Sequence, residues 1–331
     1  MQNINQVPMS AFNALVARLG PQAAISLLNS NVTSAAAVNA GIKIPYPNFT
    51  NSAVQRAQTV NQSLRPFPQF LTIDTSQSAG DKSGHSTYNA ALLRLTHRYD
   101  YGLTLDASYS FSKLLTDADT YYANGGFAED NGNRRLEKSI GLYDQTHVFK
   151  INSIYNLPLG KGHRWMSSRF ADLVAGGWRL GVVQSYSSGF PLAVTRNNPL
   201  PLFSGADRAI VSTYDNWITP VNGRFDPAKN LYLNQSVFPT QLNYVLGNET
   251  RYNPKARGFA GLNENASLAK SFRLTERFRL DFRAEAFNIF NRTIFSNPNA
   301  NLDSNTFGRV TGQNTGSYPA RQAQGALKLY W

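Results

Sequence analysis

The residues of this chain that could do chemistry are few and widely spaced. Its four histidines are His85, His97, His147 and His163, and no two of them share a spacing such as His-x-x-x-His that would direct both to one metal ion. The chain has no cysteine, so it has neither a thiolate metal site nor a disulfide framework. We therefore interpret the histidines as ordinary surface or interfacial residues.

An acidic segment, DADTYYANGG, is a second candidate, because Asp117 and Asp119 match the first two ligand positions of a calcium loop. However, Tyr121 occupies the fifth position, and Ala128 occupies the twelfth, where a bidentate glutamate is required. Neither GKG nor SSG is accompanied by the rest of a phosphate loop or a nucleophile elbow. We predict no catalytic residues, no metal site, no cofactor and no enzymatic activity.

Charged residues occupy alternate positions of one predicted strand: Arg277, Arg279, Asp281, Arg283 and Glu285. We predict that this row faces the lumen of a barrel, where it would hold a plug or line a permeation path. Alternatively, neighbouring opposite charges simply satisfy one another on a wet wall, and the alternation in sign favours this structural role.

Composition narrows the class of protein. The chain has 331 residues, a formal net charge of +12 and only 16% charged residues, against about 25% in soluble domains. Its Lys and Arg are dispersed rather than clustered, which argues against nucleic acid as a partner. No segment reaches the ~20 apolar residues of a membrane helix, and MQNINQ has no signal-peptide character.

Strict alternation of apolar and polar residues predicts several long β-strands. In YGLTLDASYSFSK, Leu103 and Leu105 fall on one face, and in ERFRLDFRAEAF, Leu280 and Phe282 lie opposite the charged row. Further strands are predicted near residues 86–98, 145–157, 176–187, 262–273 and 320–331. These segments exceed the roughly five or six residues of an ordinary strand.

The connections alternate in length, and aromatic residues gather at both strand ends. The connections at 99–102, 157–165 and 273–276 are short, and the stretches near 113–144, 188–261 and 288–319 are long. Tyr99, Tyr101, Trp165, Trp178, Phe278 and Trp331 lie at the short-turn ends, and Tyr88, Phe111, Phe149, Tyr186 and Phe287 lie at the long-loop ends. Together these features are typical of an all-β, antiparallel outer-membrane barrel with long extracellular loops.

The chain divides into two regions. Residues 1–84 lack alternation, except that Phe12, Leu15 and Leu19 recur at helical spacing, so we predict an extracellular loop region with a short helix. Residues 85–331 are predicted to form about seven barrel strands.

The last segment, RQAQGALKLYW, alternates up to the final residue and places Leu327, Leu329 and Trp331 on one face. In lipid every strand must be paired, because unsatisfied backbone groups are costly there. We therefore predict that this strand closes the ring and that Trp331 lies in an aromatic belt.

Several stretches resemble a known family: STYNAALLRLTHRYDYGLTLDASYSFSK, DQTHVFKINSIYNLPLGKG, GGWRLGVVQSYSSGFPL, RLDFRAEAFNIFNRTIF, NTFGRVT and ARQAQGALKLYW. They resemble the TonB-dependent outer-membrane receptors, especially the Oar-like group with a carboxypeptidase-regulatory-like domain. The similarity covers most of residues 40–331.

This resemblance implies that the chain is the C-terminal part of a barrel of about 22 strands, without the plug domain and TonB box. It implies a location in the cell outer membrane and import of a scarce ligand, such as a siderophore or saccharide. The implied partners are outer-membrane lipid, the barrel-assembly machinery, which would read Leu327, Leu329 and Trp331, and the TonB energy-transducing complex, which would act through the missing plug.

Two other functions remain open. A structural or adhesive surface barrel would share the strand pattern, and its long loops would contact other cells or matrix. A soluble all-β domain that binds carbohydrate, with two packed sheets, would also show alternation. Loop aromatics such as Tyr214 and Trp217 suit either a ligand or the packing of long loops, so the ligand-binding residues stay unknown.

Overall fold

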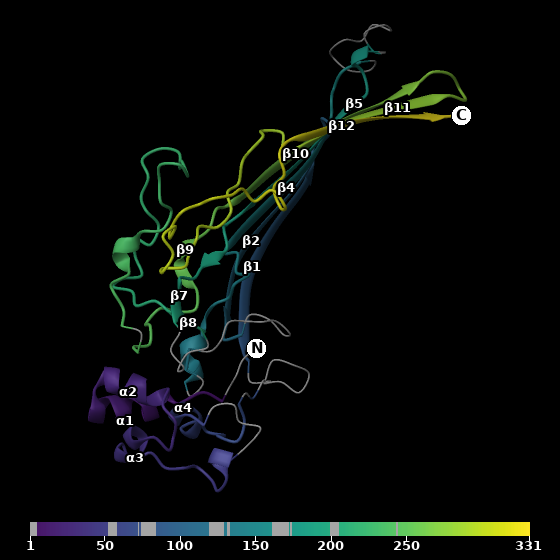
Figure 1. Ribbon diagram of the computed structural model, residues 1–331. Coiled ribbons are helices and arrows are strands. Elements are labelled where there is room, and N and C mark those ends of the chain that lie inside the picture. Colours follow the sequence, from purple (N-terminus) through teal and green to yellow (C-terminus); the bar gives the residue numbers. More distant parts are fainter. Residues whose placement is uncertain are drawn as a thin grey trace.

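One curved antiparallel sheet dominates the computed structural model (Figure 1). The structure describes residues 5–51, 58–71, 73, 84–118, 129–130, 133–160, 172, 174–198, 205–242 and 244–331. The sheet order is β1-β2-β4-β5-β10-β11-β12, with β3 (Ser139–Ile140) paired to β2. The long strands are β1 (Ser86–Arg98), β2 (Leu103–Thr116), β4 (His147–Asn156), β5 (Trp178–Ser187), β10 (Gly261–Arg273), β11 (Arg279–Phe287) and β12 (Gln322–Tyr330). They lie where the alternation predicts strands.

The pairing register aligns like residues across the sheet. Leu280 on β11, for example, pairs with Phe272 on β10 and with Leu329 on β12. A slip of one residue would turn a whole apolar set to the opposite face, so the alternation itself specifies this register. Within the described residues, the edge strands β1 and β12 each have one long-strand neighbour, and the sheet is therefore open.

Two of the three connections at one end of the sheet, termed the turn end, are tight. Between β1 and β2, the Tyr99 N–H donates to the Leu103 carbonyl at 2.8 Å, and Gly102 takes the left-handed φ of +89°. Between β10 and β11, the Leu274 N–H donates to the Phe278 carbonyl at 2.9 Å.

The third connection at the turn end is longer than predicted. The interpretation of residues 157–165 as a short connection is wrong, because β5 begins only at Trp178 and the chain between the strands is residues 157–177. Gly160 and Gly176 approach closely at its base, where a Cβ on Gly160 would lie 2.7 Å from the Gly176 Cα. Trp165 lies outside the described residues.

At the opposite end, termed the loop end, the long connections fold into a unit of their own. We define this loop unit as the described parts of residues 188–260 and 288–321. It contains the strand pairs β6 (Pro191–Leu192) with β9 (Asn253–Arg257) and β7 (Thr195–Asn198) with β8 (Gly205–Arg208), the 3₁₀ turn η3 (Gln235–Val237), and a buried core. Trp217 in this core is 2% exposed, and Thr195 bridges to Asn301, so the two long loops form one body.

The N-terminal region is more helical than predicted. The expected helix is confirmed as α1 (Met9–Leu19), and the structure adds α2 (Pro21–Leu28), α3 (Ala35–Asn39), η1 (Phe49–Asn51) and α4 (Val60–Ser63). The extra helices are too short to show clear periodicity, but side chains cap two of them: Ser34 accepts from the Ala37 N–H and Thr59 accepts from the Gln62 N–H.

These helices share a core that includes Phe12 and Leu28, and Tyr244 and Leu246 of the loop unit pack against it. Figure 1 accordingly shows α1, α2 and α3 beyond the loop end of the sheet. Between them, the described helices offer no segment of the length and apolar character needed to span a membrane.

Candidate functional site

The sheet has one apolar and one polar face, and the register extends both faces across all seven long strands. The apolar face carries Leu93, Leu95, Leu103, Leu105, Ala107, Phe149, Ile151, Leu180, Val182, Ala266, Leu268, Leu280, Phe282, Leu327 and Leu329. Leu93 and Leu327, on the two edge strands, are each 69% exposed. An apolar surface that continues from edge to edge marks an interaction surface rather than a water-facing one.

Aromatic residues lie at both ends of the apolar face, as predicted, but not all of the expected ones do. Phe149 and Tyr186 stack at the loop end with ring centroids 6.5 Å apart, and Trp178 lies on the same face at the turn end. Tyr88 and Phe287 instead lie on the polar face, because each pairs in register with polar-face positions.

The C-terminal residues continue the apolar face. Leu327 pairs with Phe282 and Leu329 pairs with Leu280. Strand β12 ends at Tyr330, so Trp331 follows the strand rather than lying within it, and its side chain is 87% exposed.

The charged row lies on the polar face, but it starts two residues later than predicted. Arg277 belongs to the turn before β11, because the chain reverses there, and the row in the strand comprises Arg279, Asp281, Arg283 and Glu285. Arg279 Nε lies 3.4 Å from Asp281 Oδ1, and Arg283 pairs with Glu285. These contacts match the structural role of mutually satisfied charges.

A second charged pair on the polar face was not singled out from the sequence. Arg94 on β1 donates two hydrogen bonds of 3.0 Å to the carboxylate of Asp106 on β2, and Thr96 donates to the same carboxylate. Arg94 and Asp106 lie on adjacent strands, so only the register reveals the pair.

Besides the exposed Lys113 at the loop end of β2, two buried charged residues interrupt the apolar face, one near each end. At the loop end, Glu264 is 1% exposed, and its carboxylate accepts from Arg292 Nε at 2.9 Å. At the turn end, the Lys270 ammonium donates to the Val174 carbonyl at 2.9 Å and lies 5.4 Å from the Trp178 ring. Each charge is thus paired or directed toward a strand end, as expected for side chains near a membrane interface.

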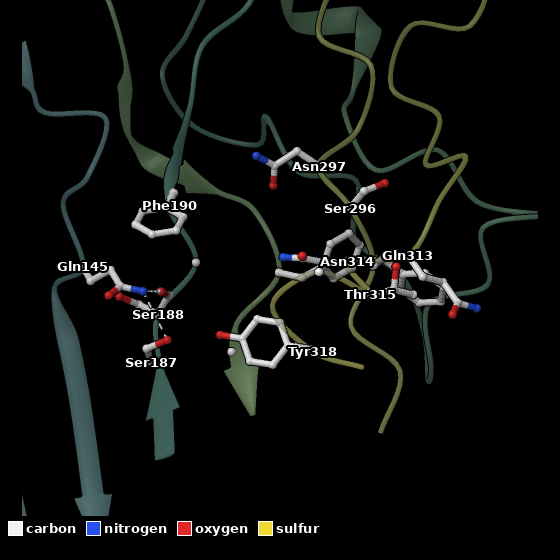
Figure 2. Close-up of a pocket in the computed structure, with 15 residues that line it drawn as sticks. Gln145, Ser187, Ser188, Phe190, Ser296, Asn297, Gln313, Asn314, Thr315 and Tyr318 are labelled. Atoms are coloured by element: carbon white, nitrogen blue, oxygen red, sulfur yellow. Dashed lines mark hydrogen bonds between the residues drawn. The ribbon is translucent and has the colours of Figure 1, made fainter. Parts of the chain in front are cut away.

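A pocket of about 300 Å³ lies at the loop end, between the strand ends and the loop unit. Figure 2 shows Gln145, Ser187 and Ser188 on one side of this space and Asn297 and Asn314 on the other. The remaining lining residues are Gly189, Phe190, Phe259, Gly261, Phe295, Ser296, Gln313, Thr315, Gly316 and Tyr318. Ser187 and Gly261 pair at the loop ends of β5 and β10, on the polar face.

The roof of the pocket is the connection between β11 and β12, residues 288–321. It is fixed by Asn288, which takes a left-handed φ of +50° directly after β11. Its side-chain amide donates to the carbonyls of Arg292 and Pro319, and its oxygen accepts from the Arg292 N–H. Farther along the roof, Phe295 bridges to Gln313, so the two arms of the loop support each other. Both ends of the roof are therefore anchored to β11.

The sequence of this chain, from the N-terminal helices to the last strand, matches a known family profile. Residues 3–324 match the outer membrane beta barrel domain. This chain belongs to that family of outer-membrane barrel domains. Its location is the outer membrane, and the alternative of a soluble domain with two packed sheets is excluded.

A solved structure of an outer-membrane protein is similar to part of this barrel domain. The outer membrane transporter YddB from Escherichia coli is similar over 75% of this chain and 26% of its own chain, with 7% sequence identity and a TM-score of 0.37. The barrel domain thus spans about a quarter of the length of that structure. No curated protein matches its sequence significantly.

A buried charge cluster around Arg208 of β8 joins the loop unit of the barrel domain to the connection that precedes β4. The guanidinium pairs with Glu137 of η2 (Arg134–Glu137) and lies 3.5 Å from Glu129 Oε2. Burial raises the pKa of Glu129 to about 7 and that of Glu249, whose carboxylate accepts from the Val194 N–H, to about 8. One arginine thus faces three carboxyl groups.

The remaining candidates from the sequence lie apart from one another. His147 Nδ1 lies 2.8 Å from the Tyr109 hydroxyl, and His85 lies 3.6 Å from Asp117. Within the described ranges, no three His, Cys, Asp or Glu side chains are grouped as metal ligands. His163 and most of the calcium-like segment, residues 119–128, lie outside the described residues.

Proposed function

We propose that the chain is the C-terminal barrel part of a TonB-dependent outer-membrane transporter that imports a scarce ligand. The observation that carries this proposal is that the pocket and the charged row share the polar face of one sheet, whose other face is apolar. Such a sheet places a ligand site and a hydrated path on the same side, with lipid on the opposite side.

In this proposal the apolar face contacts outer-membrane lipid and the polar face lines the lumen. The loop end is extracellular, because short turns are periplasmic in such barrels. The open edges at β1 and β12 pair with further strands of a larger barrel, since unpaired edges are not tolerated in lipid. Arg279, Asp281, Arg283 and Glu285 then lie on the wall below the pocket.

Energy for import comes from the TonB complex acting through a plug domain, as the family resemblance implies. Leu327, Leu329 and Trp331 present the signal that the barrel-assembly machinery reads. No step of this proposal requires a cofactor or enzymatic chemistry.

Depletion of the growth medium tests this function directly. Cells that express the complete protein are compared with cells lacking it and with cells lacking TonB, and disappearance of small molecules from limiting medium is followed by mass spectrometry. The proposal predicts at least one compound whose depletion requires both the protein and TonB. A compound that requires the protein but not TonB would contradict energised import.

An adhesive surface barrel is the second candidate, and the compact loop unit favours it. A loop unit with its own core presents a stable surface at one end of the barrel. If adhesion were the function, cells lacking the protein would lose attachment to other cells or matrix while every uptake rate stayed unchanged.

A further inference from the structure

We propose that the pocket at the loop end binds a neutral saccharide. This inference names the substrate class for the transport function proposed above and rests on it. The pocket is lined by fifteen residues, and none of them carries a charged side chain. Aromatic rings are contributed by Phe190, Phe259, Phe295 and Tyr318, and amides or hydroxyls by most of the others.

The absence of charge in the lining separates this ligand from the anionic ones. The chain carries a net charge of +12, so Lys and Arg were available to the fold, yet none lines the pocket. A carboxylate, phosphate or catecholate complex would leave its charge unpaired on entering such a pocket, which is costly. The nearby Arg257 is already committed, because its guanidinium donates to Asp144 and to the Gly189 carbonyl.

The uncharged side chains match the groups that a sugar presents. The amides of Gln145, Asn297 and Asn314 and the hydroxyl of Tyr318 both donate and accept hydrogen bonds, as sugar hydroxyls do. Aromatic rings provide flat apolar surfaces for the C–H faces of a sugar ring. Among the described residues, the Tyr318 hydroxyl and the Asn297 side chain have no hydrogen-bond partner. These groups are therefore available to a ligand.

Glycines give the pocket its shape. A Cβ on Gly261 would clash with the Tyr318 hydroxyl and lie 2.7 Å from Ser187 Oγ, so Tyr318 can lie over β10 only because residue 261 has no side chain. A Cβ on Gly258 would likewise clash with Asn297. The volume of about 300 Å³ is at the lower end of the roughly 300–1,000 Å³ of small-molecule pockets, which suits a short saccharide or one terminal sugar unit.

A glycan array tests this inference on the complete protein in detergent. The array carries neutral mono- and oligosaccharides together with sialylated and sulfated glycans, and the strongest neutral binder is then measured by calorimetry. Tyr318→Ala, which removes the ring, and Gly261→Ala, which displaces Tyr318, are each expected to weaken binding about tenfold. Gly325→Ala is the matched control, because a Cβ there meets no atom within 4 Å, and its affinity should equal that of the wild type.

The outcomes separate this inference from the transport function. Binding of anionic glycans only, binding of no neutral glycan, or neutral binding that is unaffected by Tyr318→Ala and Gly261→Ala would overturn the saccharide site. If TonB-dependent depletion of a charged compound persisted in such a case, the transport function would stand without it. Conversely, pocket-dependent sugar binding without any TonB-dependent uptake would keep the site and refute the transport.

Discussion

Leu280 on β11 and Leu329 on β12 pair directly on the apolar face of the sheet. Their neighbours Arg279 and Tyr330 also pair, on the polar face, where the guanidinium lies 4.3 Å from the ring centroid. Residues adjacent in sequence therefore experience opposite environments, and matched substitutions at neighbouring positions can distinguish lipid from water.

The first prediction concerns neighbouring positions in the middle of β10. Leu268→Arg should destabilise the membrane-inserted protein by ~2–4 kcal/mol, because the position lies far from both strand ends on the apolar face. Ser267→Arg should cost much less, since Ser267 lies on the polar face opposite Glu285. Leu280→Arg should fall between them, because it lies near the turn end. The free energy of unfolding in lipid vesicles, measured by urea titration, checks this order; equal losses for Leu268→Arg and Ser267→Arg would show that the faces are misassigned.

The second prediction concerns the last residue. Deletion of Trp331 from the complete protein should lower its outer-membrane level, because it removes an interfacial ring and part of the assembly signal. Trp331→Phe should be tolerated, since it retains an aromatic ring. Heat-modifiable gel mobility of isolated membranes measures the folded level. Normal abundance of the deletion variant would refute the assigned role of the terminus.

The third prediction compares two ion pairs of the β9 strand. Arg257→Ala should destabilise the loop unit by about 3–5 kcal/mol, because it leaves the fully buried Asp144 carboxylate without its cationic partner. Lys255→Ala is the matched control: its 2.5 Å pair with Asp215 is largely exposed on both sides, so its loss should cost only ~0–1 kcal/mol. Hydrogen exchange of loop-unit amides reports both changes. Similar protection in the two variants would be inconsistent with the buried pair holding the loops together.

The fourth prediction concerns pH. Burial raises the pKa of Glu129 to about 7 and of Glu249 to about 8. A carboxyl group whose pKa is raised in the folded state contributes stability below its unfolded pKa and loses it as the pH rises through the folded value. The loop unit should therefore lose protection from hydrogen exchange progressively as the pH rises from the ordinary carboxyl pKa of 4.5 to the folded values of about 7 and about 8, and its protection should level off above them.

Glu249→Gln should weaken this pH dependence by on the order of 5 kcal/mol over the whole interval, because a neutral amide replaces the ionising group beside Arg208 and Glu129. Glu276→Gln, in the exposed turn before β11, is the control and should leave the profile unchanged. A wild-type profile that is flat across this range would contradict the buried cluster.

The long strands could be predicted from the sequence because alternation is a local signal. Leu103, Leu105, Leu280 and Phe282 share one face in the structure, as their spacing within each strand requires. The loop unit could not be predicted in this way, since its contacts join distant segments that have no periodicity. Tyr318 lies over Gly261, and no local pattern in the sequence around either residue predicts this contact.

The site was partly predictable for the same reason. The charged row was visible because its members alternate along one strand, whereas Arg94 and Asp106 required the register between two strands. The pocket was not predicted, because amide and hydroxyl side chains are common in loops. They can be recognised as a site only when the fold brings separate segments together.

The core of the loop unit has a consequence for the order of folding. Ser187 pairs with Gly261, although all of residues 188–260 intervene, and closing so long a segment costs chain entropy. If this segment collapses around Trp217 first, its two ends come together before the strands pair. The entropy cost of pairing β5 with β10 then falls toward that of a hairpin with a short loop. Trp217→Ala should then slow the acquisition of heat-modifiable mobility during refolding into vesicles, although Trp217 lies outside the sheet; an unchanged rate would show that the strands pair first.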